Sequence, residues 1–219
     1  MLIPLLLAAV TGYLLGALPF GWLIARKFGI NIFEHGSKNP GATNVKRVLG
    51  GLFGAKGKRA GDLAFFLDAL KGAAAVGVAK VVAAEWILHR SGTVSVEAMA
   101  ITGLVFALVG HSFSCWTRFK GGKGVATSAG GLIVLLPFPT LFAVVAWVMV
   151  FQISRYVSLA SIVASVVLPA AAWLRGEPTT FAALASILGV FVILRHRANI
   201  TRLLNGTENK FAKKAAPSG

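Results

Sequence analysis

The sequence predicts an all-α integral membrane protein with seven transmembrane helices, an external N-terminus and a cytoplasmic C-terminus. Of its 219 residues, 56% are hydrophobic and 13% are charged, whereas soluble domains carry about 25% charged residues. The mean hydropathy is +0.77. Lys and Arg outnumber Asp and Glu by 22 to 7, and they gather between the apolar stretches, as in the cytoplasmic loops of membrane proteins. These three observations exclude a water-soluble globule.

The first span is predicted at residues 1–25, which contain no charged residue. About 20 apolar residues are enough to cross the hydrocarbon core. Arg26 and Lys27 follow this stretch rather than precede it, so it is not a cleaved signal peptide. We therefore expect the N-terminus outside. Residues 26–62, with eight basic side chains, are expected to form a cytoplasmic loop.

The second span, residues 63–87, carries charges within its apolar run. Charged side chains inside a span usually face a partner or a functional site. Asp68 and Lys71 are three positions apart and share a helix face, so we expect them to pair. Lys80 lies near the outer end, where its ammonium can reach the interface. The third span, residues 98–116, returns the chain to a second basic loop.

The next apolar stretch, residues 125–153, contains Pro137 and Pro139. A single helix here would place the basic C-terminal tail outside, whereas a hairpin at the prolines places the tail inside. The distribution of basic residues favours the hairpin. The last two spans are predicted at residues 157–174 and 179–194, and seven spans then leave 18 basic residues inside and two outside.

The fourth span is unusually short. Residues 125–136 extend about 18 Å as a helix, whereas the hydrocarbon core is about 30 Å thick. We therefore expect the preceding segment, Arg118–Gly124, to dip into the membrane. Backbone of this kind is tolerated at depth only where protein or a wet cavity satisfies it.

The chain is predicted to form one domain, residues 1–210, followed by a disordered basic tail, residues 211–219. Cys115 is the single cysteine and cannot form an internal disulfide. The Cys and His residues lack metal-ligand spacing and the acidic residues are scattered, so we expect no metal. Nucleic acid binding is not expected, because no basic module with aromatic or groove-fitting elements can be drawn.

Three polar clusters interrupt the apolar chain, and the predicted topology places all three on the cytoplasmic side. The first, residues 36–47, combines glycines, small hydroxyl and amide side chains, and Arg47. Glycines permit close approach of the backbone, and a guanidinium can hold phosphate through two hydrogen bonds. An ordinary turn with positive-inside charges is an equally open interpretation.

The second cluster comprises residues 110–113 and 119–127. Its glycines lead into a helix, where free backbone N–H groups and a lysine form an anion site. It is not a nucleotide P-loop, because Thr117 takes the place of the first glycine and Gly124 that of the Ser or Thr. His111 is interpreted either as a site residue or as a helix residue with satisfied hydrogen bonds.

The third cluster follows the last span and includes His196, Asn199 and Glu208. His196 and Asn199 are three positions apart, so both can face one cavity. Glu208 is the single acid among the bases of the tail. We expect it to form a salt bridge that fixes the tail rather than to act in catalysis.

These clusters resemble the motifs of the bacterial acyl-phosphate:glycerol-3-phosphate acyltransferases, the PlsY family. The resemblance covers nearly the whole chain and departs at Lys38, where Gly is common, and at Ser114–Arg118, where a Pro-containing stretch is usual. The matching residues are Gly36-Ser37-x-Asn39-Pro40-Gly41-Ala42-Thr43-Asn44-Val45-x-Arg47, Gly110-His111 with Phe119-Lys120-Gly121-Gly122-Lys123-Gly124-Val125-Ala126-Thr127, and His196-Arg197-x-Asn199-Ile200-x-Arg202-Leu203-Leu204-x-Gly206-x-Glu208.

The resemblance implies a reaction at the bacterial inner membrane, with the active site on the cytoplasmic side. A fatty acyl group passes from acyl phosphate to glycerol 3-phosphate, which gives lysophosphatidic acid and phosphate in the first step of phospholipid synthesis. The implied partners are these two substrates and the lipid bilayer. No cofactor, nucleic acid or obligate protein partner is implied.

The resemblance also assigns residues to the site. It implies catalytic roles for Ser37, Arg47, Lys123, His196 and Asn199. It implies substrate binding by Asn39, Asn44, His111, Lys120, Gly121, Gly122, Gly124 and Thr127, and a structural role for Glu208. The proton acceptor is left open between His196 and an oxygen of the donor phosphate. The His-x4-Asp dyad of other glycerol-phosphate acyltransferases is absent from the sequence.

Transport of an anionic metabolite is the alternative function of a different class. Transporters usually show paired repeats with sites near the bilayer midplane, whereas these polar clusters are predicted at one face. A non-catalytic membrane scaffold would leave the clusters unexplained. We therefore expect an enzyme.

Overall fold

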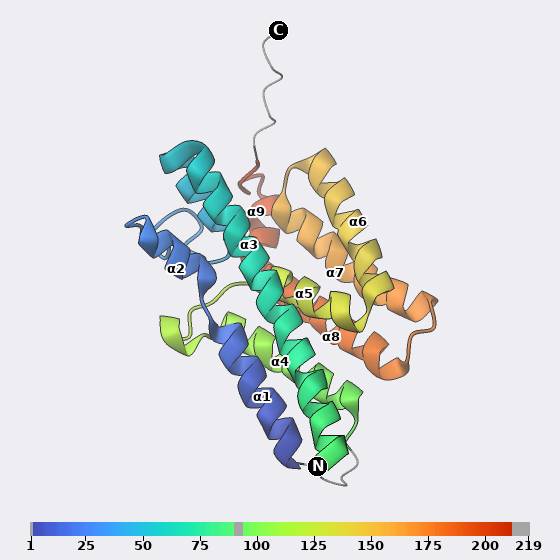
Figure 1. Ribbon diagram of the computed structural model, residues 1–219. Helices are drawn as coiled ribbons and strands as arrows, with labels where there is room; N and C mark the ends of the chain where they lie inside the picture. Colours follow the sequence, from blue (N-terminus) through green and yellow to red (C-terminus); the bar gives the residue numbers. More distant parts are fainter. Residues whose placement is uncertain (1, 90–93, 212–219) are drawn as a thin grey trace. The chain divides into compact units, whose positions relative to one another are not determined.

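The computed structural model describes residues 2–89 and 94–211, and every regular element within these ranges is a helix (Figure 1). This confirms the predicted all-α class. The chain divides into two compact units, Met1–Leu135 and Leu136–Gly219, each of which is described by itself. The elements are α1 (Leu2–Ala17), α2 (Phe20–Lys27), α3 (Ala42–His89), α4 (Val96–Ser112), the 3-10 helix η1 (Cys115–Thr117), α5 (Val125–Leu135), α6 (Pro137–Ser154), α7 (Val157–Leu174), α8 (Thr179–Arg195) and α9 (Arg197–Leu204).

The described helices include several that can cross a membrane. Four segments are long and apolar enough, and a fifth is added if α8 and α9, which are bent by 58°, count as one span. α5 is apolar but has 11 residues, in keeping with the short fourth span expected from the sequence. The chain is thus a multi-pass membrane protein, and the seven-span count and the orientation of its termini remain predictions.

The proline-containing stretch breaks where the sequence indicated. α5 ends at Leu135 and α6 begins at Pro137, with Leu136 in a non-helical conformation (φ −134°, ψ 65°). Proline fits the first turn of a helix because its missing N–H has no helical partner there. α7 coincides with the predicted span 157–174, and α8 extends the last predicted span by one residue.

In the first unit, α1, α3 and α4 lie side by side (Figure 1). α1 packs on α4 through glycine. A Cβ on Gly12 would come within 2.5 Å of the Gly103 carbonyl oxygen, and one on Gly16 would collide with the Ala107 carbonyl. α3 and α5 meet in the same way, because a Cβ on Gly72 would collide with the Thr127 carbonyl. Small residues therefore set the close spacing of these helices.

Residues 42–62, expected within a loop, are helical instead. α3 starts at Ala42 and contains a sharp kink at Phe53 and Gly54, where Gly54 has φ +55°. After the kink the helix packs back on its first part, where a Cβ on Gly57 would collide with the Leu49 carbonyl. The basic residues and glycines that resemble a loop in the sequence therefore form a tight helical turn-back.

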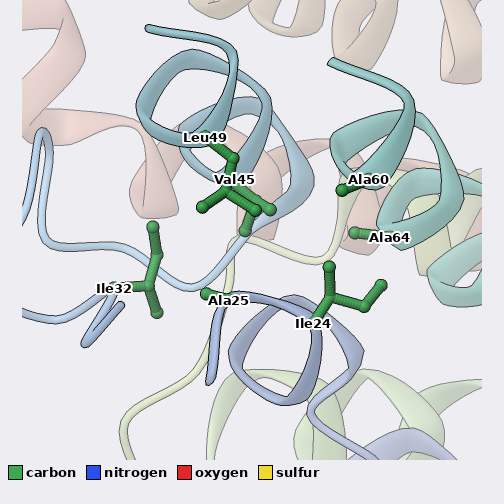
Figure 2. Packing of buried hydrophobic residues seen from close by; sticks show 7 residues of the cluster. All are labelled: Ile24, Ala25, Ile32, Val45, Leu49, Ala60 and Ala64. Atoms are coloured by element: carbon green, nitrogen blue, oxygen red, sulfur yellow. The ribbon is translucent and has the colours of Figure 1, made fainter. Parts of the chain in front are cut away.

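A small hydrophobic core holds this turn-back together (Figure 2). Its buried side chains come from α2, from the segment before α3 and from both arms of α3. They are Ile24, Ala25, Ile32, Val45, Leu49, Ala60 and Ala64. The core thus fixes the segment between α2 and α3, which contains the first motif.

In the second unit, α7 packs between α6 and α8. The indole N–H of Trp147 in α6 donates to the hydroxyl of Ser161 in α7 (3.1 Å). The tail expected to be disordered starts at Phe211, whose N–H donates to the Arg155 carbonyl (3.0 Å) and whose ring packs edge-on against Phe151. The rest of that tail, residues 212–219, lies outside the described residues.

Candidate active site

The first motif forms a loop whose shape is fixed by Asn44. The Asn44 side chain is buried (2% exposed). Its Oδ1 accepts a hydrogen bond from the backbone N–H of Ser37 (2.9 Å), and its Nδ2 donates to the carbonyls of His35 and Asn39 (3.0 Å each). Asn44, predicted to bind substrate, bonds three backbone groups through its amide and so organises the loop.

The other side chains of the first motif lie around this loop. Ser37 is exposed and Asn39 is half-buried. The Asn39 Oδ1 accepts from the N–H of Gly41 (2.8 Å), immediately before α3 begins. Arg47 is half-buried in the second turn of α3. The loop thus exposes the Ser37 hydroxyl just before the N-terminus of a long helix, where backbone N–H groups favour anions.

The second motif is held in an irregular conformation by its neighbours. Arg118 and Phe119 have left-handed φ values of +52° and +60°. The Ser114 hydroxyl donates to the carbonyl of Ala17 (2.5 Å), and the Thr117 hydroxyl donates to that of Lys120 (2.6 Å). Side-chain hydroxyls thus satisfy backbone carbonyls around this irregular segment.

The two central glycines of this motif are required by close contact. The Gly122 N–H donates to the His111 carbonyl (3.1 Å). A Cβ on Gly121 would collide with that carbonyl, and one on Gly122 would collide with the His111 ring nitrogen Nε2. The Asn39 Nδ2 reaches the Gly121 carbonyl at 3.5 Å. The first two motifs therefore meet within one unit.

The remaining residues of the second motif lead into α5. Gly124 has φ +83°, a conformation that favours glycine, and α5 starts at Val125. Lys120 is exposed and Lys123 is half-buried. Thr127, predicted to bind substrate, is fully buried, and its hydroxyl has no hydrogen-bond partner among the described residues.

A small pocket opens beside these glycines. Its lining includes Gly121, Gly122 and Lys120, together with a buried charged group formed by Asp68, Lys71 and His111. The expected Asp68–Lys71 pair is confirmed, with Lys71 Nζ 2.7 Å from Asp68 Oδ1. The contact of Asp68 with His111 was not anticipated.

The third motif lies in the second unit, at the bend between α8 and α9. His196 and Asn199 are both buried, but they do not share a continuous helix, because His196 separates α8 from α9. The His196 Nδ1 lies 2.7 Å from the Val192 carbonyl. A carbonyl can only accept a hydrogen bond, so Nδ1 carries the proton and Nε2 is the basic nitrogen of the neutral ring.

Glu208 ties this motif together. Its Oε1 accepts hydrogen bonds from Asn199 Nδ2 (2.8 Å) and from the Ser158 hydroxyl (3.0 Å), and its Oε2 pairs with Arg202 Nε (2.7 Å). Burial by itself raises the pKa of this carboxyl. The hydrogen bonds from Asn199, Arg202 and Ser158 and the charge of Arg202 outweigh burial, so the pKa of Glu208 is lowered.

The candidate residues therefore gather at two places. Residues of the first and second motifs meet in the first unit, and those of the third meet in the second unit. Within the described residues, no group of three or more His, Cys, Asp or Glu side chains is placed to hold a metal ion. The sequence did not reveal the bond between Ser158 and Glu208, because it joins side chains far apart in the chain.

Comparison with known proteins gives a consistent result. A family model described as glycerol-3-phosphate acyltransferase matches residues 6–206. The glycerol-3-phosphate acyltransferase of Fusobacterium nucleatum subsp. nucleatum is 40% identical over 92% of this chain and 95% of its own. That of Aquifex aeolicus is 38% identical over 94% of this chain and 98% of its own.

Two solved structures are also similar. Both are of PlsY (YgiH), described as an integral membrane glycerol 3-phosphate acyltransferase, and both are 36% identical to this chain. The glycerol 3-phosphate form has a TM-score of 0.80 and matches 95% of this chain and 96% of that one. The lysophosphatidic acid form has a TM-score of 0.77 and matches 95% of each chain.

Proposed function

Because the chain belongs to the glycerol-3-phosphate acyltransferase family, we propose that its acyl donor is an acyl phosphate. The enzyme transfers the fatty acyl group to glycerol 3-phosphate and releases lysophosphatidic acid and inorganic phosphate, the first step of phospholipid synthesis. One observation carries the choice of donor. The Gly121–Gly124 loop, held against the first motif by Asn39, combines the ammonium of Lys123 with a glycine backbone that a compact phosphate can approach closely.

The donor phosphate is assigned to the glycine loop, that is, to Gly121, Gly122, Lys123 and Gly124, with Ser37 and Asn199 completing its contacts. Glycerol 3-phosphate is assigned to Asn39, Arg47, Lys120 and His196. Asn44, His111 and Thr127 complete the proposed substrate-binding set, and Asn44 also holds the first motif in shape through its backbone bonds. Glu208 fixes Asn199 and the bend that contains it.

The chemistry needs a nucleophile, a cradle for charge and a proton acceptor. A hydroxyl oxygen of glycerol 3-phosphate attacks the acyl carbonyl carbon and forms the new ester bond. The bond between that carbon and the phosphate oxygen breaks, and phosphate leaves with its electron pair. The hydroxyl proton passes either to His196 Nε2 or to an oxygen of the leaving phosphate. Phosphate is a good leaving group, so positioning and charge stabilisation supply most of the catalysis.

The proposal includes a topology. Seven spans place the N-terminus outside and the C-terminus in the cytoplasm, in one domain covering residues 1–210 of a bacterial inner-membrane protein. The three motifs then open to the cytoplasm, where soluble glycerol 3-phosphate is available, and the acyl chain lies in lipid. The charge asymmetry between predicted inner and outer segments supports this topology. Neither metal, cofactor, nucleic acid nor obligate protein partner is required.

A donor assay tests the function. Purified protein in detergent is given glycerol 3-phosphate with palmitoyl phosphate, palmitoyl-CoA or palmitoyl-acyl carrier protein in separate reactions. We expect phosphate release and a lysolipid product with palmitoyl phosphate alone. Activity confined to the thioester donors would overturn the assignment. Boiled protein and omission of glycerol 3-phosphate serve as controls for spontaneous hydrolysis of the donor.

A further inference from the structure

The Asp68–Lys71 pair in α3 has no part in the mechanism above, although it is deeply buried. Asp68 is 3% exposed and Lys71 is 4% exposed, and their charged atoms are 2.7 Å apart. A buried ion pair is poor evidence for a stabilising role, because apolar side chains of similar volume often stabilise as well or better. The presence of this pair inside an apolar helix therefore indicates that it holds neighbouring groups of a functional site in position.

Lys71 connects this pair to the start of the motif region. Its Nζ donates to the carbonyl of Leu18 (2.7 Å), in the break between α1 and α2, and lies 5.5 Å from the centre of the Phe20 ring. Leu18 and Phe20 line the same pocket as Gly121 and Gly122. Lys71 thus fixes the part of the pocket lining that is formed by the segment joining α1 to α2.

Asp68 connects the pair to the glycine loop itself. Its Oδ1 lies 3.6 Å from the His111 Nδ1. The carbonyl of the same histidine accepts the Gly122 N–H, and its Nε2 lies against the Gly122 Cα, where a Cβ would collide with it. A carboxylate on one side of the ring therefore sets the orientation of a ring that touches the loop on the other side.

Residues next to the pair on α3 pack against α5, the helix that follows the glycine loop. A Cβ on Gly72 would collide with the Thr127 carbonyl, and the Ala69 carbonyl would collide with a Cβ on Gly130. Both contacts lie in α5, which follows the loop directly. One short stretch of α3, residues 68–72, therefore contacts elements on both sides of the Gly121–Gly124 loop.

We propose that Asp68 and Lys71 are positioning residues that hold His111 and the Gly121–Gly124 loop in the geometry that receives the acyl donor. This inference rests on the proposed function, because it takes that loop as the donor site. The alternative is a charge pair that only packs between helices. Loss of such a pair would affect stability, or both substrates equally, whereas loss of a positioning pair would affect use of the acyl donor.

The double variant D68N/K71M tests the proposal, because it removes both charges and leaves neither one buried without a partner. Initial rates are measured with palmitoyl phosphate and with glycerol 3-phosphate varied in turn, beside thermal unfolding. We expect a folded protein whose kcat/KM for palmitoyl phosphate falls on the order of 10- to 100-fold, as for a small displacement of a reacting group. The KM for glycerol 3-phosphate stays within about twofold of wild type.

D62N is the matched control. Asp62 also lies on α3 and pairs with a lysine, Lys46, but its side chain is 61% exposed, so wild-type kinetics are expected. D68E is the second variant if the double variant does not fold. It retains the charge pair but moves the carboxylate relative to His111, and the same donor-selective loss is expected.

Unchanged donor kinetics in a folded variant would overturn the proposal, and so would an equal loss toward both substrates. The wild-type reaction separates these results from failure of the proposed function. If wild-type protein does not use palmitoyl phosphate, the donor assignment fails and this inference fails with it. If wild-type protein is active and the variants match it, this inference alone fails.

Discussion

Replacing Gly122 by alanine puts a methyl group against the imidazole ring of His111. The new Cβ would collide with the ring nitrogen Nε2 and lie 2.9 Å from the ring carbon Cε1, whereas non-bonded heavy atoms prefer about 3.5–4.0 Å. The loop or the ring must then move by more than about 1 Å to restore that spacing. The His111 ring is held by Asp68 on its other side, so we expect the loop to move.

A displacement of this size should act mainly on catalysis. Misplacing a reacting group by about 1 Å can cost about 100-fold in rate. We expect G122A to lower kcat/KM for palmitoyl phosphate by about 10- to 100-fold. Its free energy of unfolding should fall by about 1–3 kcal/mol, the usual cost of overpacking.

The assay measures initial rates of phosphate release against palmitoyl phosphate concentration, with thermal unfolding recorded on the same preparations. G77A is the control, because a Cβ on Gly77 in α3 would meet nothing within 4 Å. It should retain wild-type kinetics, with stability unchanged or higher by up to about 1 kcal/mol. A folded G122A enzyme within about threefold of wild-type kcat/KM would show that the contact between Gly122 and His111 does not position the acyl donor.

Three further predictions concern other parts of the site. K123A should weaken use of the acyl donor without lowering the unfolding temperature, and unchanged donor kinetics would remove the lysine from the cradle. E208Q should lower the free energy of unfolding at neutral pH by about 1–3 kcal/mol, because the Glu208 carboxylate accepts bonds from Asn199 and Arg202. The pKa of Glu208 is lowered in the folded state, so its stabilisation is present above the unfolded pKa of about 4.3 and disappears as the pH falls through the folded value. The difference in unfolding temperature between wild type and E208Q should therefore shrink on acidification, and a constant difference would argue against it. Finally, EDTA should leave turnover unchanged, whereas a loss restored by magnesium would contradict a metal-free reaction.

Features encoded by neighbouring residues could be predicted from the sequence. The break at Leu136 follows from Pro137, and the bounds of α7 follow from a mostly apolar run without charged residues. The Asp68–Lys71 pair follows from helical spacing alone. In each case the signal lies within one or two helical turns.

Features that depend on distant parts of the chain could not be predicted. Residues 42–62 resemble a loop because they are basic and rich in glycine, but Gly57 and Gly61 are the positions where the two arms of α3 touch. The three backbone partners of Asn44 could not be predicted either, because they depend on how the loop before α3 folds. A side-chain amide can bond backbone groups or a ligand, and the fold determines which partners it reaches.

The central claim is that the third motif serves the same reaction as the first two. The most direct test is a distance measurement between nitroxide labels on cysteines introduced at Phe119 and Arg197, which are both exposed, with Cys115 replaced by serine. A shared active site requires a separation below about 20 Å, because one substrate pair must contact both regions. A separation clearly above that value would leave the two regions too far apart to serve one reaction.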